Sequence, residues 1–464
     1  MWADRACAAP PPVSVPSSQE FAPGQPGAAA SGPLGFLTGI RHSGFLFGNL
    51  WGLRTWLSQY GISLAIQETS EELGNLTGGV KQGFEYDGLT QMVLQMDTQR
   101  AFGWYGGTFN VSALQVHGNS LSADHLGTLQ TASGIEADRA TRLWELWYQQ
   151  KFGRSDRFSI RLGQQSLDQE FMVSQNASYF VNTMFGWPML PSADLPGGGP
   201  AYPLSAPGVR LQMRPTSALN VLTGVFSGSP LGTDALGDPQ QQNPSGTTFP
   251  LNGTLALVEF QYSYPSLGTV ISANEAPPLG RTYKLGFWYD TKGFPDQEFD
   301  DTGLSLASPA SSGTPRLHRG DWAVYGVVDQ ILWESAEDPD RTLSFFLRPM
   351  GTPLSDRNLI DFSLNAGITL HDPFEYRDED IFALGMGYAH VSGRAADFDR
   401  DAGYPERGGE TYLEVTYQYQ VTPWWVLQPD FQYVFDPGAG YVAGSNGTHV
   451  GNEAVLGVRT NIIF

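Results

Sequence analysis

The chain has 464 residues, a formal net charge of −21 and 16% charged residues, against about 25% charged residues in an average soluble domain. This charge argues against a nucleic-acid partner, because phosphate binding needs clustered Lys and Arg, and 47 Asp and Glu outnumber 26 Lys and Arg. The single cysteine, Cys7, excludes an intramolecular disulfide framework and a Cys-rich metal cluster.

The length fits either two or three soluble domains or one large closed architecture. A β-barrel of about sixteen strands is such an architecture, and the 55 Gly, 27 Phe, 19 Tyr and 12 Trp favour it. No apolar run reaches the length of about 18 residues that a transmembrane helix needs. Barrel strands give no such run, because their lipid-facing and lumen-facing residues alternate.

The N-terminal residues MWADRACA lack the basic and apolar regions of a signal peptide. Ala6-Cys7-Ala8 nevertheless has the small-residue pattern that precedes signal-peptidase cleavage. One interpretation is a start codon assigned too far downstream, with the mature protein beginning near Ala9. The alternative is a disordered tail in which this pattern occurs by chance.

Residues 1–33 are predicted to form a flexible leader, because Pro, Ala, Gly and Ser dominate from residue 8 onwards. A short amphipathic helix is expected within residues 34–60, and the barrel within 61–464. The helix is indicated by apolar side chains at helical spacing in GNLWGLRTWLSQYG, namely Leu50, Leu53, Leu57 and Tyr60.

From residue 61 to the C-terminus the apolar period changes to two, which predicts an antiparallel all-β fold. About sixteen segments follow this period, and an even number suits a single-chain bacterial barrel. The clearest segments are 91–97, 107–117, 158–165, 257–264, 283–290, 359–367, 412–421 and 454–464. The others lie near 62–67, 143–152, 208–214, 218–227, 321–333, 341–349, 380–391 and 425–435.

Long and short connections alternate between these segments, as extracellular loops and periplasmic turns do in such barrels. Two connections break the alternation: 265–280 is long for a turn, and 350–357 is short for a loop. Long connections are predicted at about 68–89, 118–141, 166–207, 228–251, 292–319 and 436–452. Short ones are predicted at 153–156, 214–217, 334–340 and 422–423.

Charged side chains gather on one face of the predicted strands. Arg459 lies opposite Val458, and Glu414 lies opposite Leu413 and Val415. An Arg or Lys facing lipid at the bilayer midplane costs about 2–4 kcal/mol, so the polar face is expected to line a wet lumen. A soluble sheet with one solvated face gives the same alternation. The number of strands favours the barrel, as do aromatic residues at strand ends, where interfacial girdles belong: Tyr105, Phe152, Tyr264, Trp424, Trp425 and Phe435.

Several segments resemble the carbohydrate-selective porin family typified by OprB. They are WGLRTWLSQYGI, GGVKQGFEYDGL, WYGGTFNVSALQVHGNSLSADHLGTLQTASGIEA, KLGFWYDT, SDRNLIDFSLNAGI, LEVTYQYQVTPWWVLQPDFQYVFDPG and AVLGVRTNIIF. The resemblance covers about residues 45–464. It implies a closed, sixteen-stranded transmembrane β-barrel in the outer membrane of a Gram-negative bacterium, through which glucose and other small sugars diffuse passively into the periplasm. The sequence departs from the family in its longer Pro-rich leader and in the Pro/Gly-rich stretch 186–207.

The resemblance also implies partners. These are small carbohydrates, outer-membrane lipid and lipopolysaccharide, and the barrel-insertion machinery, which would recognise the terminal Phe464. No cofactor is expected. No metal site is predicted either, because the seven His form no ligand motif, and the acidic clusters at 298–301 and 377–380 are more typical of solvated turns than of cation sites.

The connection 166–207 is expected to narrow the channel, because the third extracellular loop of large porins folds inward and this connection is the third by count. Asp168 and Glu170 offer hydrogen-bond partners there, and charged groups bond sugar hydroxyls more strongly than neutral groups do. Its aromatic side chains Phe171, Tyr179 and Phe180 either stack on sugar rings or anchor the loop to the wall.

Wall residues opposite this loop would complete the constriction. Mixed charges suit a neutral polyol, whereas an anion pore needs mainly Lys and Arg and a cation pore mainly acids. For each single residue, packing within the lumen is an equal alternative to contact with a substrate. The alternation selects Glu145, Trp147, Arg161, Arg210, Glu259, Trp288, Asp329, Arg348, Asp361 and Arg459.

Three other functions compete with sugar diffusion. An outer-membrane enzyme would need a catalytic set on the barrel, but the sequence has no G-x-S-x-G motif, and its lumenal carboxylates are interleaved with Arg. A structural or binding barrel would have its lumen plugged by loops. A general or organic-acid-selective porin is the nearest alternative within transport.

Overall fold

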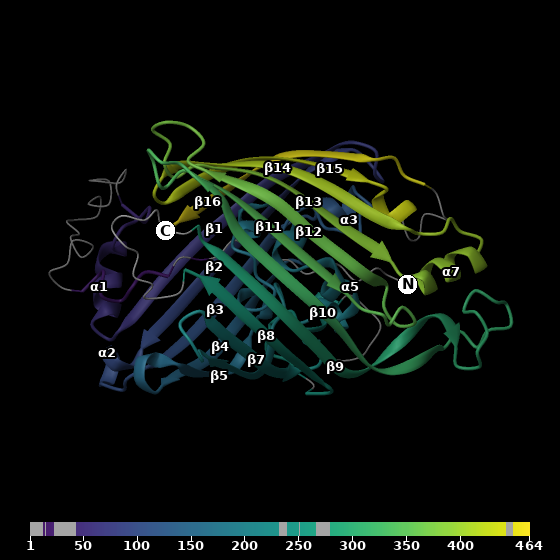
Figure 1. Ribbon diagram of the computed structural model, residues 1–464, viewed down its shortest axis with the longest axis horizontal. Helices are drawn as coiled ribbons and strands as arrows, with labels where there is room; N and C mark the ends of the chain where they lie inside the picture. The colour runs from purple at the N-terminus through teal and green to yellow at the C-terminus, as the bar shows by residue number, and fades with distance from the viewer. Residues whose placement is uncertain are drawn as a thin grey trace.

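The computed structural model describes residues 13, 15–22, 43–231, 239–249, 251–265, 279–441 and 449–464. Sixteen antiparallel strands form one closed barrel, in which each strand pairs with its neighbours in sequence and β1 pairs with β16 (Figure 1). The predicted fold class is therefore confirmed.

The strand bounds follow the predicted order closely, and the segments 158–165 and 425–435 coincide with β5 and β15. The strands are β1 (Ile62–Thr77), β2 (Gly83–Asp97), β3 (Gly107–Gly118), β4 (Ala140–Phe152), β5 (Phe158–Gln165), β6 (Ala206–Met213), β7 (Leu219–Ser227), β8 (Thr254–Tyr264), β9 (Arg281–Asp300), β10 (Pro315–Glu334), β11 (Thr342–Gly351), β12 (Ile360–His371), β13 (Ile381–Val391), β14 (Gly409–Thr422), β15 (Trp425–Phe435) and β16 (Glu453–Ile463).

Helices are short and lie in the connections. Within the described ranges, no helix is long and apolar enough to cross a membrane. The α-helices are α1 (Leu53–Ser58), α2 (Thr98–Phe102), α3 (Leu121–Asp124), α4 (Thr183–Gly186), α5 (Met189–Asp194), α6 (Pro239–Gln242) and α7 (Gly393–Asp401). The 3₁₀ helices are η3 (Leu50–Gly52), η4 (Arg154–Asp156), η5 (Leu167–Gln169), η6 (Asn176–Tyr179), η7 (Pro196–Gly198) and η8 (Pro437–Gly440).

Two predicted long loops are wrong. The segment 68–89 belongs mostly to β1 and β2, which run to Thr77 and from Gly83. Polar residues on the outward row of β1 interrupt the alternation of apolar and polar residues, so the sequence pattern did not predict the second half of this strand. The segment 292–319 contains the ends of β9 and β10, which extend past the neighbouring strands as a twisted hairpin (Figure 1). Strand ends that extend beyond the membrane do not contact lipid and need no row of apolar residues, so the apolar pattern did not predict them.

Over most of the barrel wall, side chains alternate between the lumen and the outer surface, as the sequence predicted. Glu414 is fully buried on the lumenal side, whereas its neighbours Leu413 and Val415 are exposed on the outer surface. Arg459 is buried, and Leu456 and Val458 are exposed. The outer surface is therefore apolar along these strands, as contact with lipid requires.

Ser18 contacts Ser58 of α1 and Arg100 of α2, so residues 15–22 pack against the end of the barrel that carries these helices and the C-terminus (Figure 1). Residues 15–22 fall in the predicted leader, yet Phe21 is buried, with its ring 5.6 Å from that of Phe45 and 5.4 Å from the Arg54 guanidinium. The composition of the leader could not predict this contact, because the contact depends on the single aromatic side chain Phe21. The A-x-A pattern at 6–8 and most of the leader lie outside the described residues.

The seam between β1 and β16 is fastened by buried polar contacts. Glu71 faces Arg459 in register, and their side chains form an ion pair. Arg54, also buried, donates to the backbone carbonyls of Gly48 and Phe464, and Leu46 N–H donates to the carbonyl of Ile463 at 2.8 Å. The segment before β1 thus holds the last residues of β16.

Because the closed barrel has no free edge, the folded protein should resist SDS until it is boiled. Unheated and boiled samples from outer-membrane fractions are expected to run at different positions on SDS gels. A variant that lacks residues 453–464 cannot close and should show one position. Recovery of the intact chain in a soluble fraction, without a heat-dependent shift, would contradict the barrel.

Candidate functional site

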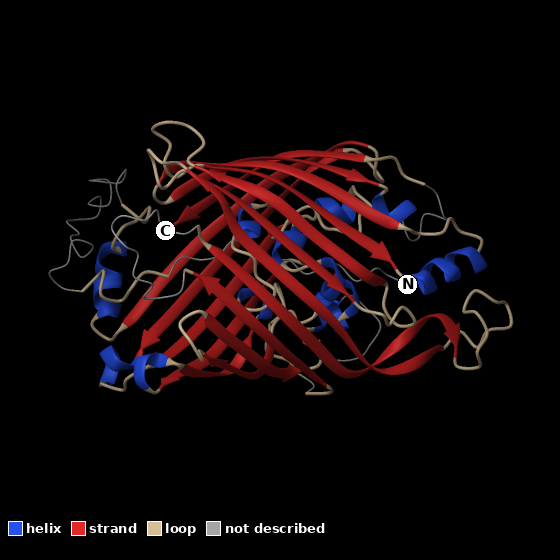
Figure 2. Cartoon of the chain, in the orientation of Figure 1, coloured by secondary structure: helices blue, strands red, loops and turns tan. Residues whose placement is uncertain are grey.

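The connection between β5 and β6, residues 166–205, folds into the lumen. Figure 2 shows its short helices within the outline of the barrel wall. Its side chains Phe171, Phe185 and Trp187 are buried in one apolar cluster with wall residues from β7 to β15. The Phe185 ring lies 5.7 Å from Phe346 and 5.3 Å from Tyr412. The loop therefore fills the side of the lumen bounded by these strands.

Arg348 on β11 fixes the loop most directly. Its guanidinium is fully buried and donates to four loop carbonyls at 2.6 to 3.0 Å: Met172, Met184, Phe185 and Gly186. Nε and Nη2 also donate to Asn365 Oδ1 on β12. The positive charge thus neutralises a group of carbonyl dipoles that would otherwise be buried without partners.

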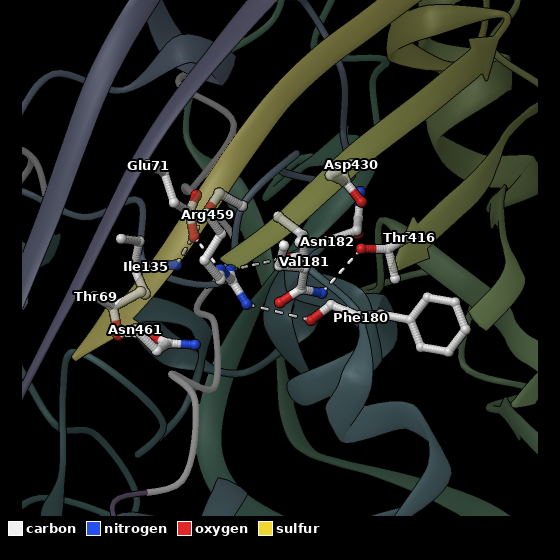
Figure 3. A network of polar contacts seen from close by, with 12 residues as sticks. Thr69, Glu71, Ile135, Phe180, Val181, Asn182, Thr416, Asp430, Arg459 and Asn461 are labelled. Carbon is white, nitrogen blue, oxygen red and sulfur yellow. Dashed lines mark hydrogen bonds and ion pairs between the residues drawn. The ribbon is translucent and has the colours of Figure 1, made fainter. Parts of the chain in front are cut away.

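A second anchor lies where the loop meets the barrel seam (Figure 3). Arg459 binds Glu71 and donates to the carbonyls of Phe180 and Val181 at 3.4 and 3.3 Å. The Glu414 carboxylate accepts from the backbone N–H groups of Val181 and Asn182 at 2.6 and 3.0 Å. Opposite charges on the wall thus satisfy both kinds of loop backbone group.

Three more predicted wall carboxylates hold the loop in the same way. Glu145 accepts from Ser166 N–H at 3.1 Å. Glu259 accepts from Met172 N–H and Tyr325 Oη, both at 2.8 Å. Asp329 accepts from the Ser174 hydroxyl at 2.6 Å. Trp288 is buried in the apolar cluster that contains Phe171, Phe185 and Trp187. These four wall residues therefore hold the loop in place.

The connection 119–139 also lies against the lumenal wall, which sequence reasoning missed. Leu121 and Leu126 are buried with Leu73 and Val455. Glu410 on β14 accepts from the N–H groups of residues 129 and 130, each at 2.8 Å. Two loops together therefore narrow the lumen.

Four side chains on the wall formed by β4, β5 and β6 meet Glu170 of the loop, and we name the five residues the Arg161 cluster: Trp147, Gln149, Arg161, Glu170 and Arg210. Arg161 Nη1 lies 3.0 Å from Glu170, and its guanidinium stacks 3.9 Å from the Trp147 ring. Arg210 Nε lies 2.6 Å from Glu170, and both Arg side chains donate to Gln149 Oε1.

Arg161 and Glu170 differ from the loop anchors in their exposure, whereas Arg210 is buried. The Arg161 and Glu170 side chains are 14% and 20% exposed, whereas Arg348 and Glu259 are fully buried. Gln149 was not predicted, although it shares the lumenal row of β4 with Glu145 and Trp147. A stricter use of the two-residue period would have found it.

Asp168 was predicted to face the pore but is buried near the base of the loop. It accepts from the Ser166 hydroxyl at 2.6 Å and from Tyr202 N–H at 2.9 Å. Burial raises the pKa of Asp168 to about 6, and these hydrogen bonds oppose the rise. The carboxyl group therefore joins the start of the loop to its end.

Asp361 does not follow the alternation that assigned it to the lumen. A β-bulge lies between Ile360 and Phe362, and the Asp361 carboxylate is 2.7 Å from His390 Nδ1. Phe362 pairs with His390 and is exposed on the outer surface. One extra residue in the strand thus moves Asp361 away from the other wall residues.

The loop aromatics favour the anchoring alternative. Phe171 and Phe180 are buried, and Phe180 stacks on Phe185 with ring centroids 4.1 Å apart. Tyr179 is half-buried and makes an edge contact with His371 at 5.1 Å.

The acidic cluster 298–301 lies at the end of β9 and in the turn that follows it, and the cluster 377–380 lies in a turn. Asp300 accepts hydrogen bonds from Thr302, Leu304 and Ser312 around a tight connection. Arg377 pairs with Asp380 at 2.7 Å. Within the part of the chain that the structure describes, no group of three or more His, Cys, Asp or Glu is placed to hold a metal ion.

A closed barrel with an apolar outer surface and a lumen narrowed by internal loops defines an outer-membrane porin. The family model described as "Carbohydrate-selective porin, OprB family" matches residues 81–464, and the chain belongs to this family. It is an outer-membrane channel for sugars and, like other porins, is not an enzyme. The predicted family, location and carbohydrate transport are confirmed.

Individual relatives are similar to this chain over nearly its whole length. Porin B of Pseudomonas aeruginosa is 24% identical over 452 residues, which cover 91% of this chain and 92% of Porin B. The high-pH structure of Pseudomonas putida OprB superposes with a TM-score of 0.78 at 22% identity, covering 91% of this chain and 99% of that one. Its low-pH structure, at 17% identity and the same coverage, gives 0.54. The structural likeness supports the fold.

Replacing Arg348 with Ala should loosen the loop, because hydrogen bonds to a charged group contribute about 1.5–3 kcal/mol each and four carbonyls lose this donor. We expect a larger and noisier single-channel conductance in planar bilayers, with the heat-dependent gel shift retained.

Arg341→Ala is the matched control, because it removes the same charge at the turn before β11, where Arg341 contacts Asp372. Wild-type conductance in Arg348→Ala would contradict the anchoring role.

Proposed function

We propose that the Arg161 cluster is the constriction at which sugars are selected. The observation that carries this proposal is the difference in use among the lumenal charges. Arg348, Glu259 and Asp329 bind buried groups of the loop, whereas Arg161 pairs with the loop carboxylate Glu170 and both side chains stay partly exposed.

The chemistry of the cluster suits a neutral polyol. Each sugar hydroxyl both donates and accepts, and the cluster offers guanidinium donors beside the acceptors Glu170 and Gln149. Because Glu170 already pairs with both Arg side chains, the cluster presents hydrogen bonds without the strong excess of one charge that an ion-selective pore uses.

Transport through this site is passive. A sugar exchanges hydrogen bonds with water for hydrogen bonds with the cluster, then leaves down its gradient. Useful flux needs binding that is strong enough to admit the sugar and weak enough to release it, so saturation should be weak.

Replacing Arg161 or Arg210 with Ala should weaken sugar binding at the constriction. Loss of about 1.4 kcal/mol raises the half-saturating sugar concentration about tenfold. Glucose block of ion current in planar bilayers measures this value, and swelling of liposomes in glucose and in size-matched organic acids measures selectivity.

Arg341→Ala should leave both readouts unchanged. Wild-type saturation in both cluster variants would place the selective site elsewhere. Equal swelling of the wild-type liposomes in sugars and organic acids would indicate a general porin, and no swelling would indicate a plugged barrel.

We also propose that Phe464 serves as the recognition end for the barrel-insertion machinery. In support, the Phe464 ring stacks on Phe47 with centroids 5.5 Å apart, and its N–H donates to the Ile66 carbonyl at 2.9 Å. The terminal aromatic thus lies at the seam between β16 and β1. The apolar outer rows, with exposed Leu285 and Phe260 among them, are proposed to contact outer-membrane lipid, including lipopolysaccharide.

Deleting Phe464 should lower the amount of heat-shiftable barrel in cells several-fold while synthesis, measured by pulse labelling, is unchanged. Purified protein should still refold in detergent, where no machinery acts. Phe47→Ala removes the stacking partner and keeps the terminal residue, so it separates packing from recognition. Normal assembly of the deletion variant in cells would contradict the role.

A further inference from the structure

Four buried polar residues meet where the inward loop, residues 166–205, touches the wall of β9 to β12. They are Asp194 on α5 of the loop, Asp290 on β9, Asp321 on β10 and Asn358 in the connection between β11 and β12. Asp290, Asp321 and Asn358 are fully buried, and Asp194 is 7% exposed. We name these four residues the rim oxygen cluster.

Hydrogen bonds and strand register bring the four residues together. Asp290 and Asp321 are direct partners in the β9–β10 register, so their side chains lie on the same face of the sheet. Asn358 Nδ2 donates to Asp321 Oδ1 at 2.8 Å. Asp194 Oδ1 accepts from the N–H groups of residues 359 and 360 at 3.0 and 3.2 Å, directly beyond Asn358. The loop thus meets three segments of the wall at one place.

Each residue of the rim oxygen cluster has one oxygen atom to spare. The Oδ1 atoms of the carboxylates are used within the protein, and that of Asp290 accepts from Lys292 N–H at 2.8 Å. Within the described part of the chain, Oδ2 of Asp194, Asp290 and Asp321 accepts no hydrogen bond, and neither does Oδ1 of Asn358. The spare groups of the cluster are therefore all acceptors.

The Asn358 amide is an independent sign of a ligand, because it carries no charge of its own. Its nitrogen faces two acceptors, Asp321 Oδ1 at 2.8 Å and Thr352 Oγ1 at 3.5 Å, which fixes the orientation of the amide. Its oxygen is then left buried beside the carboxylates. A buried acceptor in this position is unfavourable unless a donor or a cation satisfies it.

The charges around the rim oxygen cluster favour a cation. Burial, and then the charge of Asp321, raise the pKa of Asp194 above its ordinary value. Arg357 acts on Asp321 from nearby, but its guanidinium already pairs with Asp356 at 2.9 Å. The cluster therefore holds more negative charge than its surroundings offset.

The ligand atoms are those that a hard divalent cation prefers. Ca²⁺ binds carboxylate and amide oxygens in a flexible geometry, whereas Mg²⁺ demands a near-ideal octahedron. The described residues contain no three acids placed around one metal ion. The direct ligands are therefore two carboxylates and one amide, Asp194, Asp321 and Asn358, while Asp290 adds negative charge.

We propose that the rim oxygen cluster binds a Ca²⁺ ion that ties α5 of the inward loop to the barrel wall. The loop and the connection 352–359 both follow odd-numbered strands, so they lie at the end of the barrel opposite α1 (Figure 1). That end carries the long connections, which are extracellular in such barrels. The ion thus reaches the site from the external medium.

The first experiment measures binding. Full-length protein purified in neutral detergent is treated with EDTA, dialysed and titrated with CaCl₂ in a calorimeter. The wild-type chain is expected to bind one Ca²⁺ ion at a saturable site. Asp321→Asn and Asn358→Ala should each weaken binding about tenfold or more and keep the heat-dependent gel shift.

Asp296→Asn is the matched control. It removes a buried carboxylate from the same β9–β10 hairpin, but both Asp296 oxygens already have partners in Glu298 N–H and His318. This variant should bind Ca²⁺ as the wild-type chain does. No saturable binding by the wild-type chain overturns the proposal, as does unchanged binding in the two cluster variants. Equal weakening in the control indicates diffuse attraction to an acidic protein and also overturns it.

The second experiment measures the effect on the loop. Single-channel currents are recorded in planar bilayers with Ca²⁺ and then with EGTA at matched ionic strength. Removing Ca²⁺ should make the wild-type current noisier, because α5 loses a link to the wall. Asp321→Asn should be noisy in both solutions, and Asp296→Asn should respond as the wild type does. Equal noise in the two solutions for the wild-type chain overturns the link. No sugar is present, so the result does not depend on the Arg161 cluster.

Discussion

The barrel depends on one constraint: inside the bilayer every backbone N–H and C=O must find a partner within the protein. Strands meet this requirement when the last pairs with the first, so the β1–β16 seam decides whether the fold exists. The buried Glu71–Arg459 pair and the hold of Arg54 on the Phe464 carbonyl lie at this seam. Residues from both ends of the chain must therefore be in place before any lumenal site is formed.

Closure also forces side chains to alternate between lipid and lumen, which concentrates charge in a narrow interior. Those charges then divide according to where the inward loop lies. Arg348 satisfies loop carbonyls, and Glu414 satisfies loop N–H groups. Arg161 instead pairs with the Glu170 side chain of the loop, and both side chains keep exposed surface. The same residue types thus bind buried backbone groups of the loop in one part of the lumen and a partly exposed loop side chain in another.

Sequence periodicity predicted the strands and the lumenal rows well, because both depend on neighbouring residues. It placed β5 and β15 at their bounds and Arg161 and Arg210 on adjacent lumenal rows. It could not separate anchors from the Arg161 cluster, since Arg348 meets Met184 across 164 positions of sequence. It also failed at Asp361, where a bulge depends on pairing with the next strand.

The failure at 68–89 has a different cause, because there the alternation itself is modified. Glu68, Ser70 and Glu72 place polar groups on the row that lipid normally selects to be apolar, and a periodicity test therefore reads a loop. Strand register shows that the backbone is regular through all three residues. A polar outward row therefore removes the sequence signal of a strand, and only the pairing of β1 with β2 and β16 reveals it.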